Sequence, residues 1–550
     1  MKTQKLLVIG GVAAGASFAA RARRLSEQAQ ITVIERGPDV SFANCGLPYY
    51  IGGEIPERKS LAVQTAASLK AMLNLDVRTR TEAIAIDRTA KRVLVRVLDS
   101  EKEEWLDYDR LMLSPGAAPV VPETPGIDDP RIFTLRDLGD MDRIAAAAQP
   151  GMRAVVVGAG FIGLEMAEQL HRRGLTVEVV QIGQQVLSLL DAKLAGMLED
   201  ELKNNHIDLH LGEQVVRFES AEKELLCHLT SGAVLPADLV IMSIGVRPES
   251  RLAKDAGLTL GERGHIAVND FMQTSDPDIY AAGDVVETRE RTMGGQIAVP
   301  LGGPANRQGR VAADHIFLAE KARPYPGSLG TAIVRVFEMT AGTTGFNESG
   351  LKKSGIDYDT VTVRDFHHAS YYPGAKPLNL KIFWEKGSGR LLGAQAAGQE
   401  GVDKRLDVLA TAITAKMHID DLCHLELAYA PPFGSAKDVI NIAGFTATNM
   451  HDELLEVTSD FPDASADVQL LDVRPNAISN MTPVPGAINI PYAALRSNLD
   501  KLDPKKPVVA FCFVGKNSYF ASRLLAQHGF KVKSLAGGLS VNNRQKSISC

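Results

Sequence analysis

The ten residues LLVIGGVAAG, at positions 6–15, join a short apolar run to a glycine-rich turn. Helix-forming residues occupy positions 16–25, and a second apolar run, ITVIE, occupies positions 31–35. This order predicts a strand, a turn, a helix and a second strand. Gly10 and Gly15 would then let the backbone approach a pyrophosphate at the N-terminus of the helix. The middle glycine of the usual G-x-G-x-x-G pattern is replaced by valine, so the turn alone would also suit other α/β proteins.

The same pattern recurs further along the chain. The stretch AVVVGAGFIG, positions 154–163, contains a strict G-x-G-x-x-G motif formed by Gly158, Gly160 and Gly163. A helix is predicted over 164–173, directly after the motif. Two dinucleotide-binding units in one chain predict an FAD enzyme that is reduced by NADH or NADPH.

A third motif, DIYAAGD at positions 278–284, resembles the second flavin-contact motif of disulfide reductases with two dinucleotide-binding domains, in which the aspartate holds the ribityl chain. It follows the second unit, which indicates that the nicotinamide domain is inserted within the flavin domain. Glu35 closes the second strand of the first unit, where a carboxylate can reach a ribose hydroxyl. The candidate flavin-binding residues are Gly10, Gly15, Glu35, Arg36 and Asp284.

Gln181 occupies the position that would select between the two nicotinamides, at the end of the second strand of the second unit. An acidic residue there favours NADH, and basic residues after it favour NADPH. The stretch QIGQ, positions 181–184, has neither. The absence of Arg or Lys favours NADH, and NADPH stays open.

The composition limits the classes of protein and partner. The chain has 550 residues and a formal net charge of −6, and roughly 150 residues per domain predicts three to four domains. The mild acidity without a basic run argues against nucleic acid or an anionic membrane as a partner. No apolar run reaches the roughly 18–20 residues of a membrane span. The five scattered cysteines form neither a disulfide framework nor a zinc site, so we expect no metal and a cytoplasmic location.

Cys45 lies in the stretch SFANCGLPYY, positions 41–50, in a loop that would continue into a helix against the flavin. The N-terminus of that helix would stabilise a thiolate. The loop has one cysteine rather than a spaced pair, so no disulfide can form within it. Turnover would therefore carry Cys45 through a mixed disulfide, a persulfide or a sulfenic acid.

The chain resembles coenzyme A disulfide reductases fused to a rhodanese domain, a type also described as NADH-dependent persulfide reductases. The resemblance to the reductase spans residues 4–450 and rests on GGVAAGASFAARARRL, SFANCGLPY, GAGFIGLE, IYAAGD, HASYYPGA, KRLDV and YAPPFGSAKD. It implies an α/β fold with two Rossmann-like dinucleotide-binding domains, for FAD and NAD(P), an α+β dimerisation domain and a C-terminal α/β rhodanese domain. The implied activity is reduction of coenzyme A disulfide, coenzyme A persulfide or polysulfide by a homodimer that uses NAD(P)H.

The predicted domain boundaries follow the motifs. They give an FAD-binding domain at 1–150 and 266–325, an NAD(P)-binding domain at 151–265, a dimerisation domain at 326–451, an acidic linker at 452–467 and a rhodanese domain at 468–550.

The resemblance also implies which residues bind coenzyme A. The candidates are Ser17, Arg21, Arg24, Ser41, Asn44 and Asn306. The first three share one face of the first helix because they are spaced by four and three residues, and guanidinium groups suit the 3′-phospho-ADP group. The next two would flank the pantetheine arm beside the cysteine. At the last position some relatives have a different residue.

Two tyrosines, Tyr371 in HASYYPGA and Tyr429 in YAPP, resemble those that reach the flavin site from the partner subunit. A phenol can protonate a departing thiolate and stabilise the charge that develops there. Without the resemblance, both would be interpreted as core aromatic residues, and Tyr372 is an alternative to its neighbour.

The C-terminal segments LLDVR, PVPGAINIP and CFVGKNSY resemble a rhodanese domain, in which Cys512 begins a loop of inward-pointing backbone amides. The family usually has arginine where Asn517 stands and glycine where Ser518 stands. Cys512 would either handle sulfane sulfur or belong to a module kept for docking or regulation. The cysteines without a motif or a predicted role are Cys227, Cys423 and Cys550.

Two other functions remain open. An NADH peroxidase or oxidase shares the single cysteine and cycles it through sulfenic acid, but the arginine face and the rhodanese fusion argue against it. A non-catalytic sulfur-transfer or redox-sensing protein would keep the flavin half as a scaffold, against which the intact Cys45 loop and the strict second glycine motif argue. The sequence does not distinguish disulfide from persulfide as the substrate, or say how sulfur moves between Cys45 and Cys512.

Overall fold

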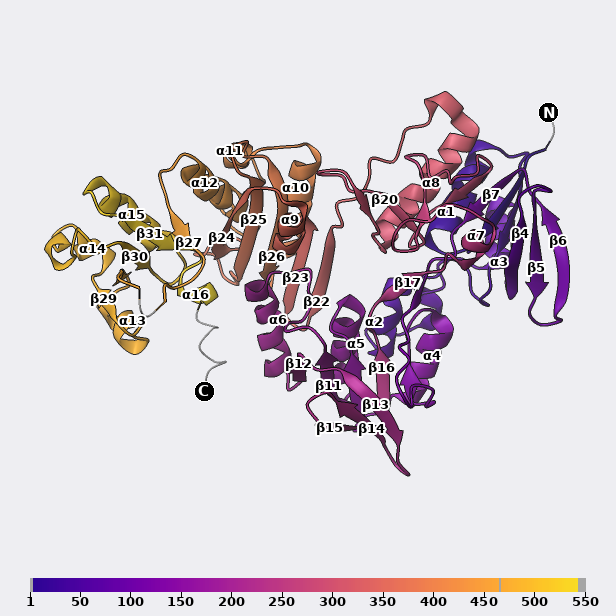
Figure 1. The fold of residues 1–550 in the computed structure, drawn as a ribbon, viewed down its shortest axis with the longest axis horizontal. Coiled ribbons are helices and arrows are strands. Elements are labelled where there is room, and N and C mark those ends of the chain that lie inside the picture. The colour runs from indigo at the N-terminus through magenta and orange to yellow at the C-terminus, as the bar shows by residue number, and fades with distance from the viewer. Residues whose placement is uncertain (1–2, 464–465, 543–550) are drawn as a thin grey trace. The chain divides into compact units, whose positions relative to one another are not determined.

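The first predicted strand is β1 (Lys5–Ile9), the central strand of a parallel five-stranded sheet in the computed structural model (Figure 1). The structure describes residues 3–463 and 466–542. The sheet has the order β19-β7-β1-β2-β3, with β2 at Gln30–Ile34, β3 at Asp76–Arg78, β7 at Arg110–Leu113 and β19 at Ile279–Ala281. Strand β19 returns to this sheet from beyond the second nucleotide unit, as the position of the DIYAAGD motif predicted.

Two helices, α1 (Ala13–Leu25) and α8 (Gly302–Leu318), pack against each other over one face of this sheet. They approach closely because Gly309 has no side chain, and a Cβ there would lie 2.3 Å from the carbonyl oxygen of Ala14. Apolar residues of a second group cover the other face. The further elements of this region are α2 (Leu47–Ile51), α3 (Ala66–Leu73), β4 (Thr81–Asp87), β5 (Arg92–Val97), β6 (Lys102–Asp107), α7 (Arg251–Asp255), β18 (Ile266–Ala267), β20 (Val286–Arg289) and β21 (Gln296–Ile297).

The second glycine motif begins a second parallel sheet, with the order β12-β11-β10-β16-β9. Its strands are β9 (Ile132–Phe133), β10 (Arg153–Val157), β11 (Thr176–Gln181), β12 (Asp208–Leu211) and β16 (Leu239–Met242). Helix α5 (Phe161–Arg172) starts at the motif itself, three residues before the predicted start. The predicted boundary at residues 150 and 151 is wrong in one respect, because β9 lies before it and pairs with β16 of this sheet.

The two nucleotide units are joined by a short antiparallel ribbon. Its strands are β8 (Ala117–Pro119) and β17 (Val246–Pro248), one on the way into the second unit and one on the way out. The remaining elements of the second nucleotide unit are α4 (Leu138–Ala147), β13 (Val215–Ser220), β14 (Leu225–Leu229) and β15 (Val234–Ala237), and α6 (Ala192–Asn204) lies between β11 and β12 in the sequence.

The chain forms two compact units. The first comprises residues 1–184 and 206–328 and holds both parallel sheets, and the second comprises 185–205 and 329–550. Helix α6 therefore belongs to the second unit, although its sequence lies between β11 and β12.

The second unit begins with an antiparallel five-stranded sheet, with the order β22-β23-β26-β25-β24. Its elements are β22 (Ala332–Val336), β23 (Met339–Gly345), α9 (Glu348–Ser354), β24 (Tyr358–Phe366), β25 (Pro377–Glu385), β26 (Leu391–Gly398), α10 (Val402–Thr414), α11 (Ile419–His424) and α12 (Val439–His451). Its central strands are largely buried, and every residue of β26 is buried. Helices α10, α11 and α12 contribute to the same core.

A parallel sheet with the order β27-β31-β30-β28-β29 ends the described chain. Its elements are β27 (Val457–Thr458), β28 (Gln469–Asp472), α13 (Asn476–Met481), β29 (Ala487–Asn489), α14 (Tyr492–Leu495), β30 (Val508–Phe511), α15 (Lys516–Gln527), β31 (Val532–Leu535) and α16 (Leu539–Asn542). The segment predicted as an acidic linker contains β27, which pairs with β31. The last domain therefore starts before residue 468, because its edge strand lies within that segment. Cys550 is outside the described residues.

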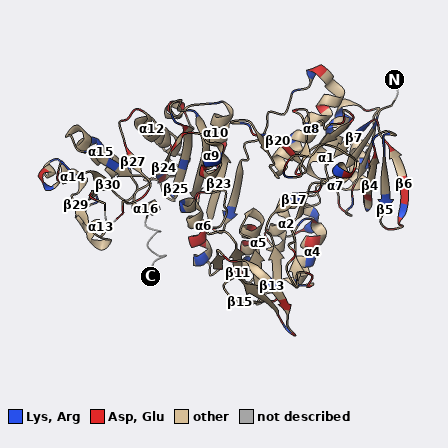
Figure 2. Ribbon diagram, in the orientation of Figure 1, with Lys and Arg blue, Asp and Glu red and all other residues tan. Residues whose placement is uncertain are grey.

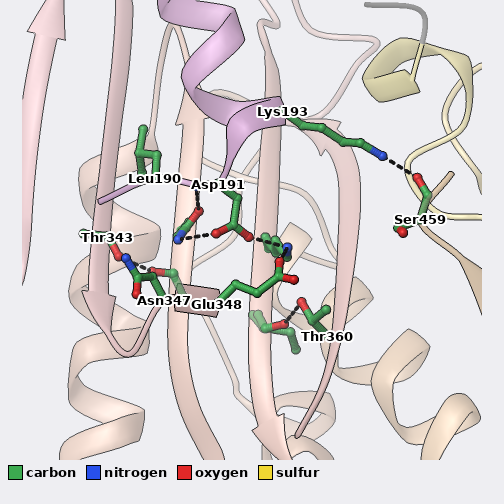
Figure 3. A network of polar contacts seen from close by, with 12 residues as sticks. Leu190, Asp191, Lys193, Thr343, Asn347, Glu348, Thr360 and Ser459 are labelled. Atoms are coloured by element: carbon green, nitrogen blue, oxygen red, sulfur yellow. Dashed lines mark hydrogen bonds and ion pairs between the residues drawn. The ribbon is translucent and has the colours of Figure 1, made fainter. Parts of the chain in front are cut away.

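Polar contacts tie α6 to the rest of the second unit (Figure 3). The ammonium group of Lys381 lies between the carboxylates of Asp191 and Glu348, the latter at 3.1 Å. Lys193 binds the carbonyl oxygen of Ser459 and lies 2.9 Å from a carboxylate oxygen of Asp460. One helix is thus held both by the antiparallel sheet and by the last domain.

We expect the Glu348 contact to make stability depend on pH. Burial alone would raise the pKa of Glu348, but Lys352 and Lys381 outweigh burial and lower the pKa to about 2. A depressed carboxyl pKa adds stability above about pH 4.5 that is lost as the pH falls towards 2. Chemical denaturation should find Glu348→Gln less stable than the wild type at pH 7, with a difference that shrinks from pH 4.5 to pH 3. A difference independent of pH would contradict this assignment.

Basic and acidic residues are interspersed along the ribbon (Figure 2). On β5 and β6, for example, Arg96 lies 2.9 Å from Glu103. Over residues 3–463 and 466–542, no helix has both the length and the apolar character needed to cross a membrane. In the same ranges, no group of three or more His, Cys, Asp or Glu side chains is arranged to hold a metal ion.

Candidate active site

A cavity of about 1120 Å³ opens beside the first parallel sheet. Six of the predicted residues line it together, namely Gly10, Glu35, Arg36, Asn44, Cys45 and Asp284. The N-terminal residues of α1 and α8 line it as well, and neither helix start is capped by a side chain. Uncapped helix N-termini present free N–H groups to an anion, so the cavity has the size and the donors for a dinucleotide pyrophosphate.

The glycines of the two turns have the same packing. A Cβ at Gly15 would lie 1.9 Å from the carbonyl oxygen of Gly10, and one at Gly163 would lie 1.9 Å from that of Gly158. A Cβ at Gly160, by contrast, would meet no described atom within 4 Å. The packing of each turn against its helix therefore requires glycine at positions 15 and 163. The open space beside Gly160 is instead of the kind that lets a dinucleotide approach the backbone.

A serine completes each turn. The hydroxyl of Ser114 donates to the carbonyl oxygen of Gly10 at 2.9 Å, and that of Ser243 donates to the carbonyl oxygen of Gly158 at 3.0 Å. Both serines follow the strand that neighbours the turn, β7 in one unit and β16 in the other. The sequence analysis missed this pair, whose only signal is its matched position in the two units.

Glu35 of the first nucleotide unit and Gln181 of the second occupy equivalent positions. A carboxylate oxygen of Glu35 accepts from the backbone N–H of Gly11 at 2.9 Å, and the amide oxygen of Gln181 accepts from that of Ala159 at 3.0 Å. Glu35 thus keeps its carboxylate at the cavity wall, as ribose recognition requires. Gln181 presents a neutral amide in its place.

Cys45 lies in a single turn of 3-10 helix, Asn44–Gly46, directly before α2. The residue is exposed, and its thiol lies 3.9 Å from the side-chain oxygen of Asn44. Helix α2 contacts α5 of the second nucleotide unit through the hydroxyl of Tyr49, which donates to Glu165 at 3.0 Å. The cysteine loop is therefore attached to the helix that follows the second glycine motif.

Two carboxylates of the protein oppose the predicted stabilisation of a Cys45 thiolate, which stays a prediction for the flavin-loaded enzyme. Partial removal of the sulfur from water raises the pKa of the Cys45 thiol, and the carboxylates of Glu165 and Asp284 raise this pKa further. Glu165 was also missed as a site residue, although it stands two positions after Gly163 in the GAGFIGLE motif.

We expect Glu165→Gln to make Cys45 more reactive. The change removes a negative charge that disfavours the thiolate, while the amide can still accept from Tyr49. Alkylation of Cys45 by iodoacetamide at pH 8, followed by peptide mass spectrometry, should accelerate about two- to threefold. Glu178→Gln is the matched control, because the charge of Glu178 acts on Cys227 instead. Equal rates in the two variants would contradict this role of Glu165.

The predicted coenzyme A residues lie on two surfaces of the first unit. Ser17 hydrogen-bonds to Asn306 of α8, which brings these two candidates together. Arg21 is paired with Asp314 at 2.5 Å, and Arg24 is exposed on the same helix. The two remaining candidates, Ser41 and Asn44, belong to the cysteine loop, and Asn44 lines the cavity.

The two candidate tyrosines meet in the second unit. Their phenol oxygens lie 3.0 Å apart, and the side chains of Tyr371 and Tyr429 are 74% and 49% exposed. The hydrogen bond to Tyr429 raises the pKa of Tyr371. The two phenols are therefore open to a group from outside their own domain, rather than part of a core.

Cys512 is buried at the end of β30, before the N-terminus of α15. The N–H of Gly515 donates to its sulfur at 3.2 Å. Ser518, where the rhodanese family usually has glycine, places its hydroxyl 3.8 Å from that sulfur and accepts from the hydroxyl of Ser534 at 3.0 Å. Asn517 is exposed. The loop thus supplies one amide donor to the sulfur, while the Ser518 hydroxyl accepts from the thiol and donates to the carbonyl oxygen of Gly515 at 2.9 Å.

Comparison with protein families accounts for this arrangement. A family model described as pyridine nucleotide-disulphide oxidoreductase matches residues 4–302. The chain belongs to this family. The dimerisation-domain model of the same oxidoreductases matches residues 331–438, and a rhodanese-like domain model matches residues 458–542. The predicted α/β fold, with Rossmann-type nucleotide domains, a dimerisation domain and a rhodanese domain, is confirmed.

Individual members of the family are similar over most of the chain. A coenzyme A disulfide reductase of Staphylococcus haemolyticus is 36% identical over 449 residues, which are 81% of this chain and 100% of that protein. The crystal structure of reduced Bacillus anthracis CoADR-RHD is 42% identical with a TM-score of 0.95, and covers 98% of both chains. A NAD-dependent persulfide reductase from A. fulgidus is 39% identical with a TM-score of 0.93, and the match covers 98% of this chain and 99% of that one.

Proposed function

We propose that this oxidoreductase uses NADH or NADPH to reduce coenzyme A disulfide through Cys45. Its FAD would lie in the cavity beside the first sheet, held by the glycine turn, Glu35, Arg36 and Asp284. The second glycine motif, Gly158 to Gly163, would hold the nicotinamide cofactor. The similarity to coenzyme A disulfide and persulfide reductases over nearly the whole chain supports this activity.

A single observation carries the proposal. Among the described residues, Cys45 is the one cysteine that lines the cavity containing the predicted flavin-binding residues. The bound FAD would supply an electron pair from the reduced nicotinamide to a sulfur atom at Cys45. A cysteine without a neighbouring partner can use those electrons only on a sulfur or oxygen atom brought in by the substrate.

The chain's residues divide the chemistry between them. The thiolate of Cys45 attacks one sulfur of coenzyme A disulfide, the S–S bond breaks, and a mixed disulfide with Cys45 forms. The first coenzyme A leaves as a thiolate and takes a proton from the pair Tyr371 and Tyr429 of the partner subunit's copy in a homodimer. Two electrons then release the second coenzyme A and restore the Cys45 thiolate. Ser17, Arg21, Arg24, Ser41, Asn44 and Asn306 would bind the nucleotide and pantetheine parts of the substrate.

We extend the proposal to coenzyme A persulfide and polysulfide because of the rhodanese-like domain. Cys512 would carry a sulfane sulfur, with its charge held by the Gly515 amide. Transfer of that sulfur to the Cys45 thiolate would free the Cys512 thiolate and leave a persulfide on Cys45, which two electrons and a proton would split into the Cys45 thiolate and hydrosulfide. A reduced thiol at both positions also fits a cytoplasmic location, where thiols are kept reduced.

The test is anaerobic oxidation of NADH by the purified enzyme with one acceptor at a time. Coenzyme A disulfide, coenzyme A persulfide, polysulfide and hydrogen peroxide are compared, and NADPH is then substituted for NADH. We expect rapid turnover with a coenzyme A substrate and slow turnover with peroxide. Fast turnover of peroxide without turnover of any sulfur substrate would identify a peroxidase instead.

A further inference from the structure

The two tyrosines come from separate irregular segments, whose mutual position the sheet does not determine. Tyr371 lies in the loop 367–376 between β24 and β25, and Tyr429 lies in the loop 425–438 between α11 and α12. Direct contact between the loops includes one backbone hydrogen bond, from Ala369 to the carbonyl oxygen of Gly434 at 2.9 Å. Two exposed phenols on such loops need a further constraint to stay within hydrogen-bonding distance.

Arg405 supplies that constraint from the first turn of α10. Its side chain is 2% exposed. One terminal nitrogen of the guanidinium donates to the carbonyl oxygen of His367 at 2.7 Å and to a carboxylate oxygen of Asp438 at 2.6 Å, and Nε donates to the other carboxylate oxygen at 3.2 Å. His367 begins the loop of Tyr371, and Asp438 ends the loop of Tyr429. A single planar group therefore joins the two loops.

The surroundings keep this guanidinium in place. Asp438 caps α12 by accepting from the N–H of Ile440 at 3.1 Å, so its carboxylate is attached to a regular helix. Gly401 leaves the space that Arg405 needs, since a Cβ there would lie 2.4 Å from a guanidinium nitrogen. The neighbouring Lys404 donates to the carbonyl oxygen of Phe433, in the second loop, at 3.3 Å.

A buried ion pair of this kind adds little net stability compared with apolar residues, because both charges lose their hydration. A bidentate arginine does, however, hold its partners at a defined distance and angle. We propose that Arg405 and Asp438 are positioning residues, which hold the phenols of Tyr371 and Tyr429 as one hydrogen-bonded pair for protonating the departing thiolate. This inference rests on the proposed function of the two tyrosines.

The test is a double-mutant cycle on the flavin-loaded enzyme, with coenzyme A disulfide as the substrate. Arg405→Lys keeps the charge but loses the planar fork, and Tyr371→Phe removes one phenol. We expect each change to lower kcat about tenfold. The double variant should be no slower than the slower single variant, because Arg405 acts through the tyrosine pair. Reduction of the FAD by NADH in a single turnover should stay within about twofold of the wild type, because the tyrosine pair takes no part in that step.

A second buried pair in the same chain provides the matched control. Arg474 and Asp472 of the rhodanese-like domain also lie 2.6 Å apart, with side chains 3% and 1% exposed. Arg474→Lys should lower thermal stability as Arg405→Lys does, but leave kcat for coenzyme A disulfide unchanged. An equal loss of kcat in both variants would attribute the effect to general destabilisation and overturn the inference.

Two further outcomes are decisive. If the losses from Arg405→Lys and Tyr371→Phe multiply to about a hundredfold, the residues act independently and the inference fails, although the proposed function stands. If the wild type does not reduce coenzyme A disulfide at all, the proposed function itself fails. Should Arg405→Lys not fold, Asp438→Asn takes its place in the same cycle. Asparagine retains the helix cap and one hydrogen bond to Arg405, but it loses the second acceptor of the bidentate pair.

Discussion

Replacing Cys45 with serine should lower turnover of coenzyme A disulfide by at least about a thousandfold. A serine hydroxyl is not ionised near neutral pH and forms no stable bond to sulfur, so neither the attack on the disulfide nor the mixed disulfide is possible. The change replaces one atom in the cavity wall and leaves both glycine turns unaltered. NADH should therefore still bleach the visible absorbance of the bound flavin in an anaerobic single turnover, while steady-state oxidation of NADH with coenzyme A disulfide stops.

Cys423→Ser is the control for this result. Cys423 is partly buried between α11 and α12, where its sulfur lies 3.5 Å from the hydroxyl of Thr448. Cys423→Ser removes a thiol from the second unit and leaves the cavity lining unchanged, so activity should stay at the wild-type level. If Cys45→Ser retained more than about a tenth of the activity, the sulfur acceptor would have to lie elsewhere and the central assignment would be wrong.

The sequence predicted those parts of the fold that depend on local pattern. The glycine turns at residues 10–15 and 158–163 are such parts, because an apolar strand, a turn and a helix follow one another within a few residues. The short strands β9 and β27 could not be predicted in the same way. Each has two residues, too few for any periodicity, and each is a strand only because a distant strand, β16 or β31, pairs with it.

The same distinction between local pattern and distant packing applies to the residues of the site. Cys45 and Asp284 stand in motifs and could be named from the sequence, and the structure brings both to one cavity. Glu165 raises the pKa of Cys45 across a contact between α2 and α5, and Arg405 joins two loops that lie far apart in the sequence of the dimerisation domain. Such roles arise from packing between segments far apart in the chain, which one sequence without its structure does not reveal.

Equivalent alanine substitutions in the two glycine turns should separate the two cofactors. Gly15→Ala places a Cβ 1.9 Å from the carbonyl oxygen of Gly10 and 2.6 Å from the hydroxyl of Ser114, so α1 must move away from β1. The purified protein should then lose at least about nine-tenths of its FAD, because the donors at the N-terminus of α1 are displaced. Gly163→Ala creates the same collisions around Gly158 and Ser243. It should leave the FAD content unchanged but slow reduction of the flavin by NADH by about a hundredfold.

Gly160→Ala distinguishes loss of packing from loss of cofactor approach in this experiment. Its Cβ would meet no described atom within 4 Å, and its backbone has a φ of −80°, which any residue can adopt. Thermal unfolding of this variant should match that of the wild type, whereas its KM for NADH should rise, because the new methyl group occupies the space left for the dinucleotide. If Gly163→Ala lost FAD as completely as Gly15→Ala, the two turns would not serve separate cofactors. An unchanged KM in Gly160→Ala would place the nicotinamide away from the second turn.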